Sequence, residues 1–258
     1  MGTGVLTIVA GTSGAQQKDN LCGPFWAARV LNESGYTTWD GRPIDSDLIA
    51  LHARTLLPEA HVGPDVPPGA VSLTGYLYEL PTGPVEESGT SAPRLAQAIE
   101  AASNGELRVV SLRGEWTPER VERLVGGARE LGVRLIANLR TGRLWGGRPS
   151  IEILLGELEG RSVQEPAADW DVGHFVALET LIRGPRGSLV VVHDSYPSLG
   201  WAGRHLQPPR AVASALLRGD GREGGVLAVA PKAQEESMKA LAERIGLETG
   251  AWDNGSRS

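Results

Sequence analysis

The chain has 258 residues, of which 41% are hydrophobic and 22% are charged, a balance typical of a globular protein. Its formal net charge of −6 argues against a general nucleic-acid binder. A single cysteine excludes an intrachain disulfide and a thiolate-rich metal site, and a cytoplasmic setting is expected. Because no apolar run approaches the roughly 20 residues of a membrane span, we also expect no membrane partner.

The N-terminal part of the chain predicts one strand and two helices. The short apolar run Val5–Ala10 is expected to form a strand. Apolar residues in 22–35 follow helical spacing, with Pro24 in the first turn, where its missing N–H costs little. A second helix is expected over residues 44–57, ending before a proline.

Residues 58–93 differ in composition from the rest of the chain. Prolines and glycines recur throughout this segment, and Val71–Leu80 has a hairpin-like pattern. The segment is expected to be a long insertion over one face of the protein. Two interpretations stay open, a lid over a functional site and a plain surface loop.

Further helices and strands are expected from residue 92 onward. Helices are expected at residues 92–103, 117–131, 149–159, 208–218 and 232–246. Strands are expected at residues 107–112, 133–139, 174–183, 188–194 and 225–230. Helices come first in the chain and an antiparallel-looking sheet follows, so we expect one α+β domain with an N-terminal helix packed on that sheet. We also expect a C-terminal helical tail at 232–258 whose last nine residues are frayed.

The only cysteine, Cys22, stands where a polar approach gives way to the first helix. The dipole and free N–H groups of a helix start favour a thiolate, which is the nucleophilic form of cysteine. A lone cysteine is otherwise most often a small buried apolar residue. Its place before Gly23-Pro24 favours the nucleophile.

Two further residues complete a constellation with this cysteine. His174 begins the apolar strand 174–183, and Asp194 ends the next one. An imidazole exchanges a proton near neutral pH, and a carboxylate can fix its orientation and tautomer. A strand-end aspartate is also a common turn residue, and a lone histidine is often structural. The adjacent His193 points to the opposite face of the strand and is expected to be structural.

These motifs resemble the papain-like cysteine peptidases, and most closely the domains that trim double-glycine leaders in bacterial peptide exporters. The resemblance covers residues 14–35 and 133–231. It rests on Gln16 six residues before Cys22-Gly23-Pro24, on His174-Phe175-Val176-Ala177-Leu178, and on Asp194 behind Val190-Val191-Val192-His193. The sequence departs from this family at Leu21, where an aspartate is common, and in the long interval between Cys22 and His174.

The resemblance implies a papain-like fold and a cysteine-dependent mechanism. Cys22 would attack a carbonyl, His174 would transfer protons and Asp194 would hold His174. The Gln16 side chain would stabilise the oxyanion beside the Cys22 N–H, and Gln17 is the alternative if the register differs by one.

The expected function is that of a cysteine-dependent peptidase or amidase acting on a peptide or amide substrate. Two alternatives stay open, a papain-fold acyltransferase or transpeptidase and a non-catalytic peptide-binding module. Trp170 and Trp201 are candidates for the walls of a substrate cleft. We expect no metal and no cofactor, because the five histidines lack paired metal-ligand spacing.

Overall fold

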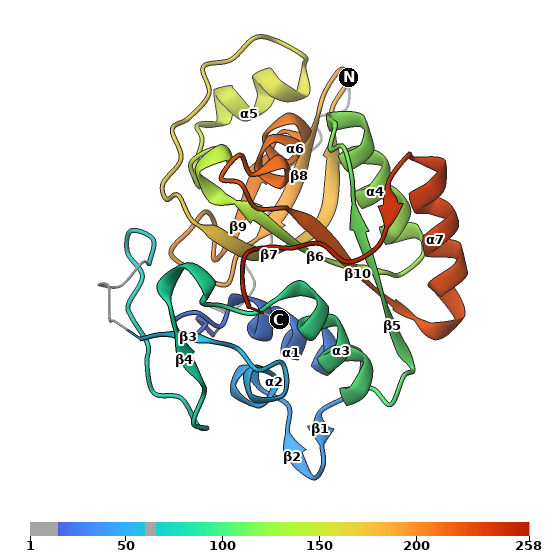
Figure 1. The fold of residues 1–258 in the computed structure, drawn as a ribbon. Coiled ribbons are helices and arrows are strands. Elements are labelled where there is room, and N and C mark those ends of the chain that lie inside the picture. The colour runs from blue at the N-terminus through green and yellow to red at the C-terminus, as the bar shows by residue number, and fades with distance from the viewer. Residues whose placement is uncertain (1–14, 60–65, 258) are drawn as a thin grey trace.

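The fold is built on one antiparallel sheet (Figure 1). The computed structural model describes residues 15–59 and 66–257, and within these residues seven strands form the main sheet in the order β11-β5-β10-β6-β7-β8-β9. All neighbouring strands in it are antiparallel. The strands are β5 (Leu107–Arg113), β6 (Arg134–Arg140), β7 (Gly173–Arg183), β8 (Ser188–His193), β9 (Arg204–Gln207), β10 (Gly225–Pro231) and β11 (Glu248–Thr249). The predicted α+β class and antiparallel sheet are confirmed, whereas the strand expected at Val5–Ala10 lies outside the described residues.

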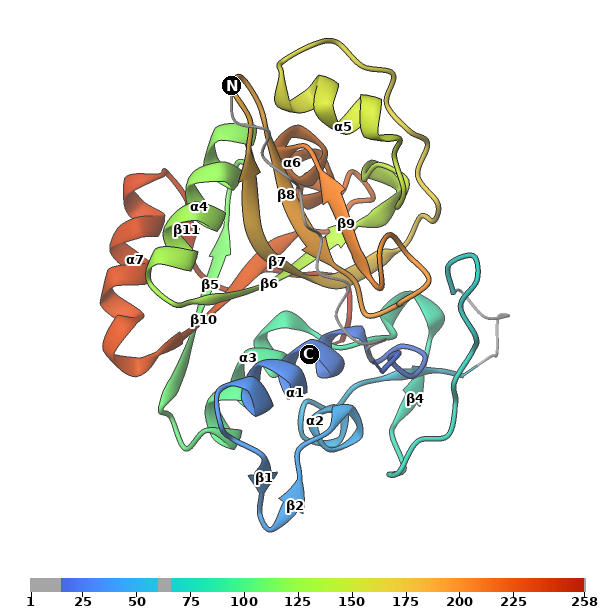
Figure 2. The same ribbon diagram turned by 180° about the vertical axis from the view of Figure 1, so that it is seen from behind.

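Helices cover both faces of the main sheet (Figures 1 and 2). One face carries α1 (Cys22–Glu33), α2 (Ser46–His52) and α3 (Ala92–Ala102). The other carries α4 (Pro118–Glu130), α6 (Pro209–Leu217) and α7 (Glu235–Arg244), and α5 (Ile151–Leu158) packs against β8. Short elements complete the described chain: β1 (Thr38–Trp39), β2 (Arg42–Pro43), β3 (Leu57–Pro58), β4 (Thr82–Gly83), η1 (Val85–Glu87), η2 (Thr141–Arg143) and η3 (Lys232–Gln234).

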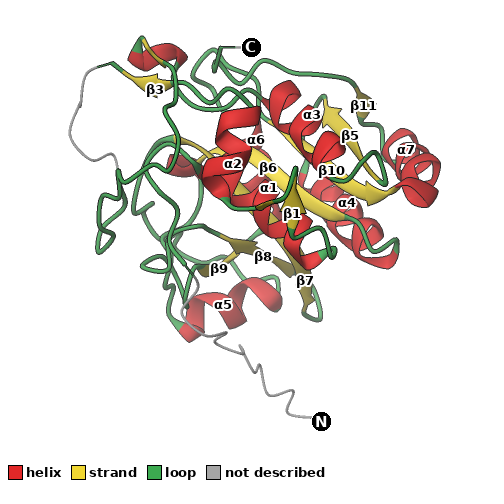
Figure 3. Cartoon of the chain, turned by 90° about the horizontal axis from the view of Figure 1, so that it is seen from below, coloured by secondary structure: helices red, strands yellow, loops and turns green. Residues whose placement is uncertain are grey.

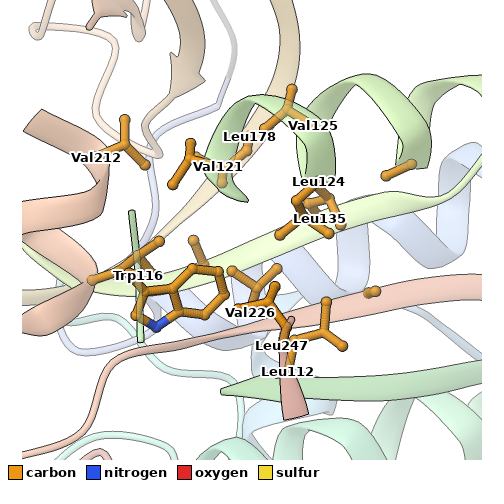
Figure 4. Packing of buried hydrophobic residues seen from close by; sticks show 14 of the residues in the cluster. Leu112, Trp116, Val121, Leu124, Val125, Leu135, Leu178, Val212, Val226 and Leu247 are labelled. Carbon is orange, nitrogen blue, oxygen red and sulfur yellow. The ribbon is translucent and has the colours of Figure 1, made fainter. Parts of the chain in front are cut away.

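The strand sequences explain why the sheet is covered on both sides. Side chains alternate between the two faces of a strand. Along β6, Leu135 joins the apolar cluster under α4, α6 and α7, whereas the next residue, Ile136, joins the cluster with α1 and α3. Leu135 and Leu124 of α4 lie together in the first of these clusters (Figure 4). Burial on both faces fixes the register, because a slip of one residue would exchange the two sets.

The insertion at 58–93 contains no hairpin within its described residues, so the prediction for Val71–Leu80 was wrong. The backbone there hydrogen-bonds to a different partner, the polar segment before Cys22. The Asp19 carboxylate accepts from the Leu73 N–H at 3.1 Å and from the Ser72 hydroxyl, and the Asp19 N–H donates to the Leu73 carbonyl at 2.9 Å. The insertion therefore supports the chain immediately before the first residue of α1.

The C-terminal segment belongs to the core, and the expectation of a frayed end was wrong for its described residues. Trp252 is buried in the cluster that contains α1 and α3. Asn254 accepts a hydrogen bond from the N–H of Ala92, the first residue of α3, at 3.2 Å. The C-terminal end lies beside α3 in Figures 1 and 3. The buried side chains of Trp252 and Asn254 therefore hold this segment against the core, although its sequence is mostly polar.

Candidate active site

Cys22 is the first residue of α1 and is half-buried. Leu21, the residue before Cys22, is fully buried, and its side chain caps no backbone N–H. No capping side chain therefore accepts a hydrogen bond from the first N–H groups of the helix. Gly23 allows α1 to approach β7 closely, because a Cβ at this position would lie 3.1 Å from Leu95 Cδ2 and 3.2 Å from Phe175 Cδ2. This close approach brings Cys22 beside His174, the residue that precedes Phe175.

The environment of Cys22 favours its thiolate. Burial by itself would raise the pKa of the Cys22 thiol. The charge of His174 and a hydrogen bond with it act in the opposite direction, as do the backbone N–H groups of Phe175 and Gly23. Together these contacts outweigh burial and place the pKa of Cys22 below its ordinary value.

His174 is buried and lies between the thiol and a carboxylate. Its Nε2 is 3.2 Å from Asp194 Oδ1, which leaves Nδ1 for Cys22. Burial alone would lower the pKa of His174, but the negative charges of Asp194 and Cys22 and hydrogen bonds to both raise that pKa to about 10. The structure therefore brings together the three residues that the sequence analysis singled out.

Asp194 is fixed by the loop that joins β8 to β9. Its N–H donates to the Gly203 carbonyl at 2.7 Å, and its Oδ1 accepts from the Tyr196 N–H at 2.9 Å. Gly203 has φ +86°, and a Cβ there would lie 2.7 Å from the Asp194 carbonyl oxygen, so glycine is required. Burial would raise the pKa of Asp194, but His174 lowers it below its usual range, and Asp194 is held as a carboxylate.

The two glutamines before α1 have different surroundings. The Gln16 side chain hydrogen-bonds to the backbone of Val71 in the insertion. Gln17 is buried and lies beside His174. Its Oε1 accepts from the Ser195 hydroxyl at 2.5 Å, and its Nε2 donates to Tyr196 Oη at 3.1 Å and to the Lys18 carbonyl at 3.2 Å. The Ser195 hydroxyl in turn lies 3.4 Å from His174 Nε2. The structure thus places the alternative glutamine, Gln17, beside the other site residues.

The two candidate tryptophans also lie in different surroundings, and only one of them is near His174. Trp170 is half-buried, and its ring centroid lies 5.0 Å from that of His174 in an edge-to-face arrangement. Tyr196 contacts both rings, at 5.4 Å from Trp170 and 5.9 Å from His174. Trp201 instead packs against the apolar cluster between α5, β8 and β9. Trp170 and Tyr196 therefore form the aromatic surroundings of His174.

Four residues around this site were missed by the sequence analysis: Ser195, Tyr196, His205 and Gln207. Ser195 follows Asp194 directly, and its contact with Gln17 joins segments 178 positions apart, which no local pattern reveals. His205 and Gln207 lie on β9, a four-residue strand that was not predicted. The alternation His205-Leu206-Gln207, with two polar side chains on one face of a buried strand, is the signal that was available.

The described residues contain no group of three or more His, Cys, Asp or Glu side chains arranged to hold a metal ion. Among the helices formed by residues 15–59 and 66–257, none combines the length and apolar character that a bilayer-spanning helix needs.

The fold and site define an α+β protein with a Cys-His-Asp cluster where the first helix meets β7 and the end of β8. The sequence matches a family of unknown function, DUF6885, over residues 3–253, and the chain belongs to this family. Comparison with curated proteins found no match, and neither did comparison with solved structures.

Proposed function

We propose that this protein is a papain-like, cysteine-dependent peptidase or amidase that acts through a thioester acyl-enzyme. One observation carries the proposal: Cys22 at the start of α1 contacts His174, and Asp194 binds the other side of the same ring. A lowered thiol pKa beside a raised imidazole pKa is the electrostatic signature of a thiolate–imidazolium pair.

The reaction follows from the positions of the protons. The Cys22 thiolate attacks the carbonyl carbon of a peptide or amide and forms a tetrahedral oxyanion. The His174 imidazolium gives its Nδ1 proton to the leaving nitrogen, the C–N bond breaks and the thioester remains. Water then attacks the thioester and gives one proton back to His174, which releases the acid and restores the pair. Asp194 stays ionised and holds the ring throughout.

The oxyanion requires donors aimed at it. The N–H of Cys22 has no acceptor within α1, because it belongs to the first residue of the helix. For the second donor we propose Gln17 rather than Gln16, because Gln17 is buried beside Ser195 and His174. Its Nε2 donates to the Lys18 carbonyl and to Tyr196 Oη, so one of these two N–H groups has to turn to the oxyanion when substrate binds. The Gln16 amide instead binds the exposed backbone of Val71 in the insertion, away from His174.

The test is formation of a covalent acyl-enzyme. The protein is mixed with p-nitrophenyl acetate, and acetylation is followed by intact mass and by release of p-nitrophenol. We expect one acetyl group on Cys22 in the wild type, none in Cys22→Ala, and acylation at least about 10²-fold slower in His174→Ala at neutral pH. Equal acylation rates for wild type and His174→Ala would contradict the proposal and favour a binding module on the same scaffold.

The same experiment separates hydrolysis from acyl transfer. Glycinamide is added to the preformed acyl-enzyme, and the products are measured. Release of acetate in its presence supports the hydrolase, whereas N-acetylglycinamide as the main product identifies an acyltransferase that uses the same intermediate. How well the substrate-occupied site excludes water decides between these outcomes.

A further inference from the structure

One oxygen of the central carboxylate is left without a partner. Asp194 Oδ1 accepts from His174 Nε2 and from the Tyr196 N–H. Asp194 Oδ2 is buried and has no hydrogen-bond partner among the described residues. His205 Nε2 lies 4.0 Å from Asp194 Oδ2, and this nitrogen is also buried and without a hydrogen-bond partner among the described residues. Two orphaned polar atoms thus face each other beside the proposed catalytic pair.

The surroundings of His205 fix which of its nitrogens carries the proton. The Trp145 N–H donates to Gln207 Oε1 at 2.7 Å, and a backbone N–H can only donate, so this atom of Gln207 must be the carbonyl oxygen. The Gln207 NH₂ group therefore donates, to the Trp145 carbonyl at 2.9 Å and to His205 Nδ1 at 3.1 Å. Because Nδ1 accepts, a neutral His205 carries its proton on Nε2, the atom that faces Asp194.

We propose that His205 is a positioning residue of this site, whose Nε2–H holds Asp194 Oδ2 and thereby fixes the carboxylate that orients His174. The proposal rests on the proposed function of Cys22 and His174. A separation of 4.0 Å is longer than a hydrogen bond, and an approach of about 1 Å closes it. Hydrogen bonds of this kind are often long in a free enzyme and tighten in the substrate complex.

A neutral donor suits this position better than a cation. Four titratable groups act on His205: Asp194 and His193 from β8 and its end, His174 from β7, and Asp169 from the loop before β7. Burial outweighs the two carboxylates and lowers the pKa of His205, which keeps the ring neutral. A neutral N–H satisfies Asp194 Oδ2 without cancelling its charge, so the full negative charge remains available to the His174 imidazolium.

The experiment compares His205→Phe with His205→Gln. Phenylalanine keeps a buried ring and removes the donor, whereas glutamine keeps an N–H donor. Iodoacetamide labelling of Cys22 is measured at pH 6, where thiolate depends on the ion pair, and at pH 10, where any accessible thiol is ionised. We expect His205→Phe to label about tenfold more slowly at pH 6 and within about twofold of wild type at pH 10. His205→Gln should stay within about threefold of wild type at both values.

A matched pair in the Asp194→Asn background shows whether the effect passes through Asp194. There, adding His205→Phe should change labelling at pH 6 by less than about twofold. If His205→Phe does not fold, Gln207→Met serves instead, since it frees His205 to adopt the other tautomer and should also slow labelling at pH 6. An unchanged rate at pH 6 in a folded variant, an equal loss at both pH values, or a loss that persists beside Asp194→Asn would overturn the proposal.

Failure of this inference can be distinguished from failure of the proposed function. If wild-type Cys22 labels at pH 6 no faster than a free thiol, the ion pair itself is absent and both proposals fall. If the wild type labels rapidly and the His205 variants match it, only the role of His205 falls.

Discussion

At the scale of single residues, the site depends on how the two nitrogens of His174 are divided. Nε2 is bound by Asp194, so only Nδ1 can exchange a proton with Cys22. The ring is further held by Trp170 and Tyr196, which limit its rotation. A buried imidazole with a fixed orientation and a carboxylate on one side can hold its proton far above its ordinary pKa.

The first prediction concerns the pH dependence of Cys22 reactivity. The pKa of Cys22 is lowered by His174, so labelling by iodoacetamide should rise at acidic pH and stay high through neutrality. In His174→Ala the rise should move to about pH 8.5, the value of a free thiol. The measurement is the labelling rate between pH 4 and pH 10.

Cys22→Ala provides the blank for this series, because the chain has no other cysteine. A profile that is the same in wild type and His174→Ala would show that the two side chains are not coupled, and the chain would then be better described as a binding protein.

The second prediction concerns the oxyanion donor. Removal of one such donor typically slows the chemical step by about 10²-fold. We expect Gln17→Ala to slow acylation by about this factor, with a much smaller change in substrate binding. Gln16→Ala is the matched control, since it removes the same side chain one residue earlier and should stay within about threefold of wild type. The reverse pattern would restore Gln16 to the role that the spacing to Cys22 predicts.

The difference between these two glutamines shows where the sequence stops being informative. A spacing of six residues to the cysteine selects Gln16, but the path of the intervening chain decides which side chain faces inward. Asn20 adopts φ 62°, a left-handed conformation that turns the chain just before α1. Asp19 is bound to the insertion on the same stretch. The local sequence pattern does not predict the contacts of Asp19, because its partner Ser72 lies more than fifty residues away. It also does not predict the left-handed conformation of Asn20.

At the scale of elements, the position of Cys22 depends on the packing of α1 against β7. Alanine normally stabilises a helix relative to glycine by about 0.5–1 kcal/mol. At Gly23 the new Cβ would meet Leu95 at 3.1 Å and Phe175 at 3.2 Å, which is tighter than ordinary contact. Both neighbours are buried core residues, so neither can move aside freely.

The third prediction is therefore that Gly23→Ala destabilises the protein, by about 1–3 kcal/mol, and slows Cys22 labelling at pH 6. The matched control is Gly126→Ala in α4, where a Cβ would lie 3.5 Å from the end of the Arg183 side chain. That substitution should stabilise the protein by about 0.5–1 kcal/mol and leave labelling unchanged. Denaturant unfolding measures both. Stabilisation by Gly23→Ala would mean that α1 does not depend on close approach to β7.

Element prediction succeeded where periodicity is long and failed where it is short. The helix over α4 and the strands β7 and β8 follow from runs of six or more patterned residues. β9 has four residues and β11 two, and both are edge strands defined only by their neighbours in the sheet. A pattern of so few residues cannot distinguish a strand from a loop.

At the scale of the whole molecule, the site joins parts of the chain that are remote in sequence. Cys22 comes from a helix on one face of the sheet, His174 from β7 and Asp194 from the end of β8. Motif residues can be recognised one at a time, but their juxtaposition requires the complete sheet. The same holds for the C-terminal segment, whose burial depends on Trp252 reaching the cluster of α1 and α3. Folding of the whole molecule and assembly of the site are therefore expected to be coupled, and the stability of the protein should report the charges of the site.

The fourth prediction is a specific pH dependence of stability. The pKa of His174 is raised to about 10, so its contribution is complete below about pH 6.5, its unfolded value, and is lost as pH rises towards 10. The pKa of Cys22 is lowered, so its contribution is complete above about pH 8.5 and is lost as pH falls through the folded value. Between about pH 6.5 and 8.5 the two contributions change with pH by equal and opposite amounts, because the folded pair and the unfolded chain each hold one proton.

The measurement is the free energy of unfolding of the wild type minus that of Cys22→Ala/His174→Gln. This difference should be independent of pH between about pH 6.5 and 8.5 and should fall between about pH 8.5 and 10. Thiolate absorbance of the wild type at pH 7 identifies which member of the pair has lost its proton. A difference that is constant up to pH 10 would show that the folded protein does not retain the His174 proton, and the ion pair would have to be abandoned.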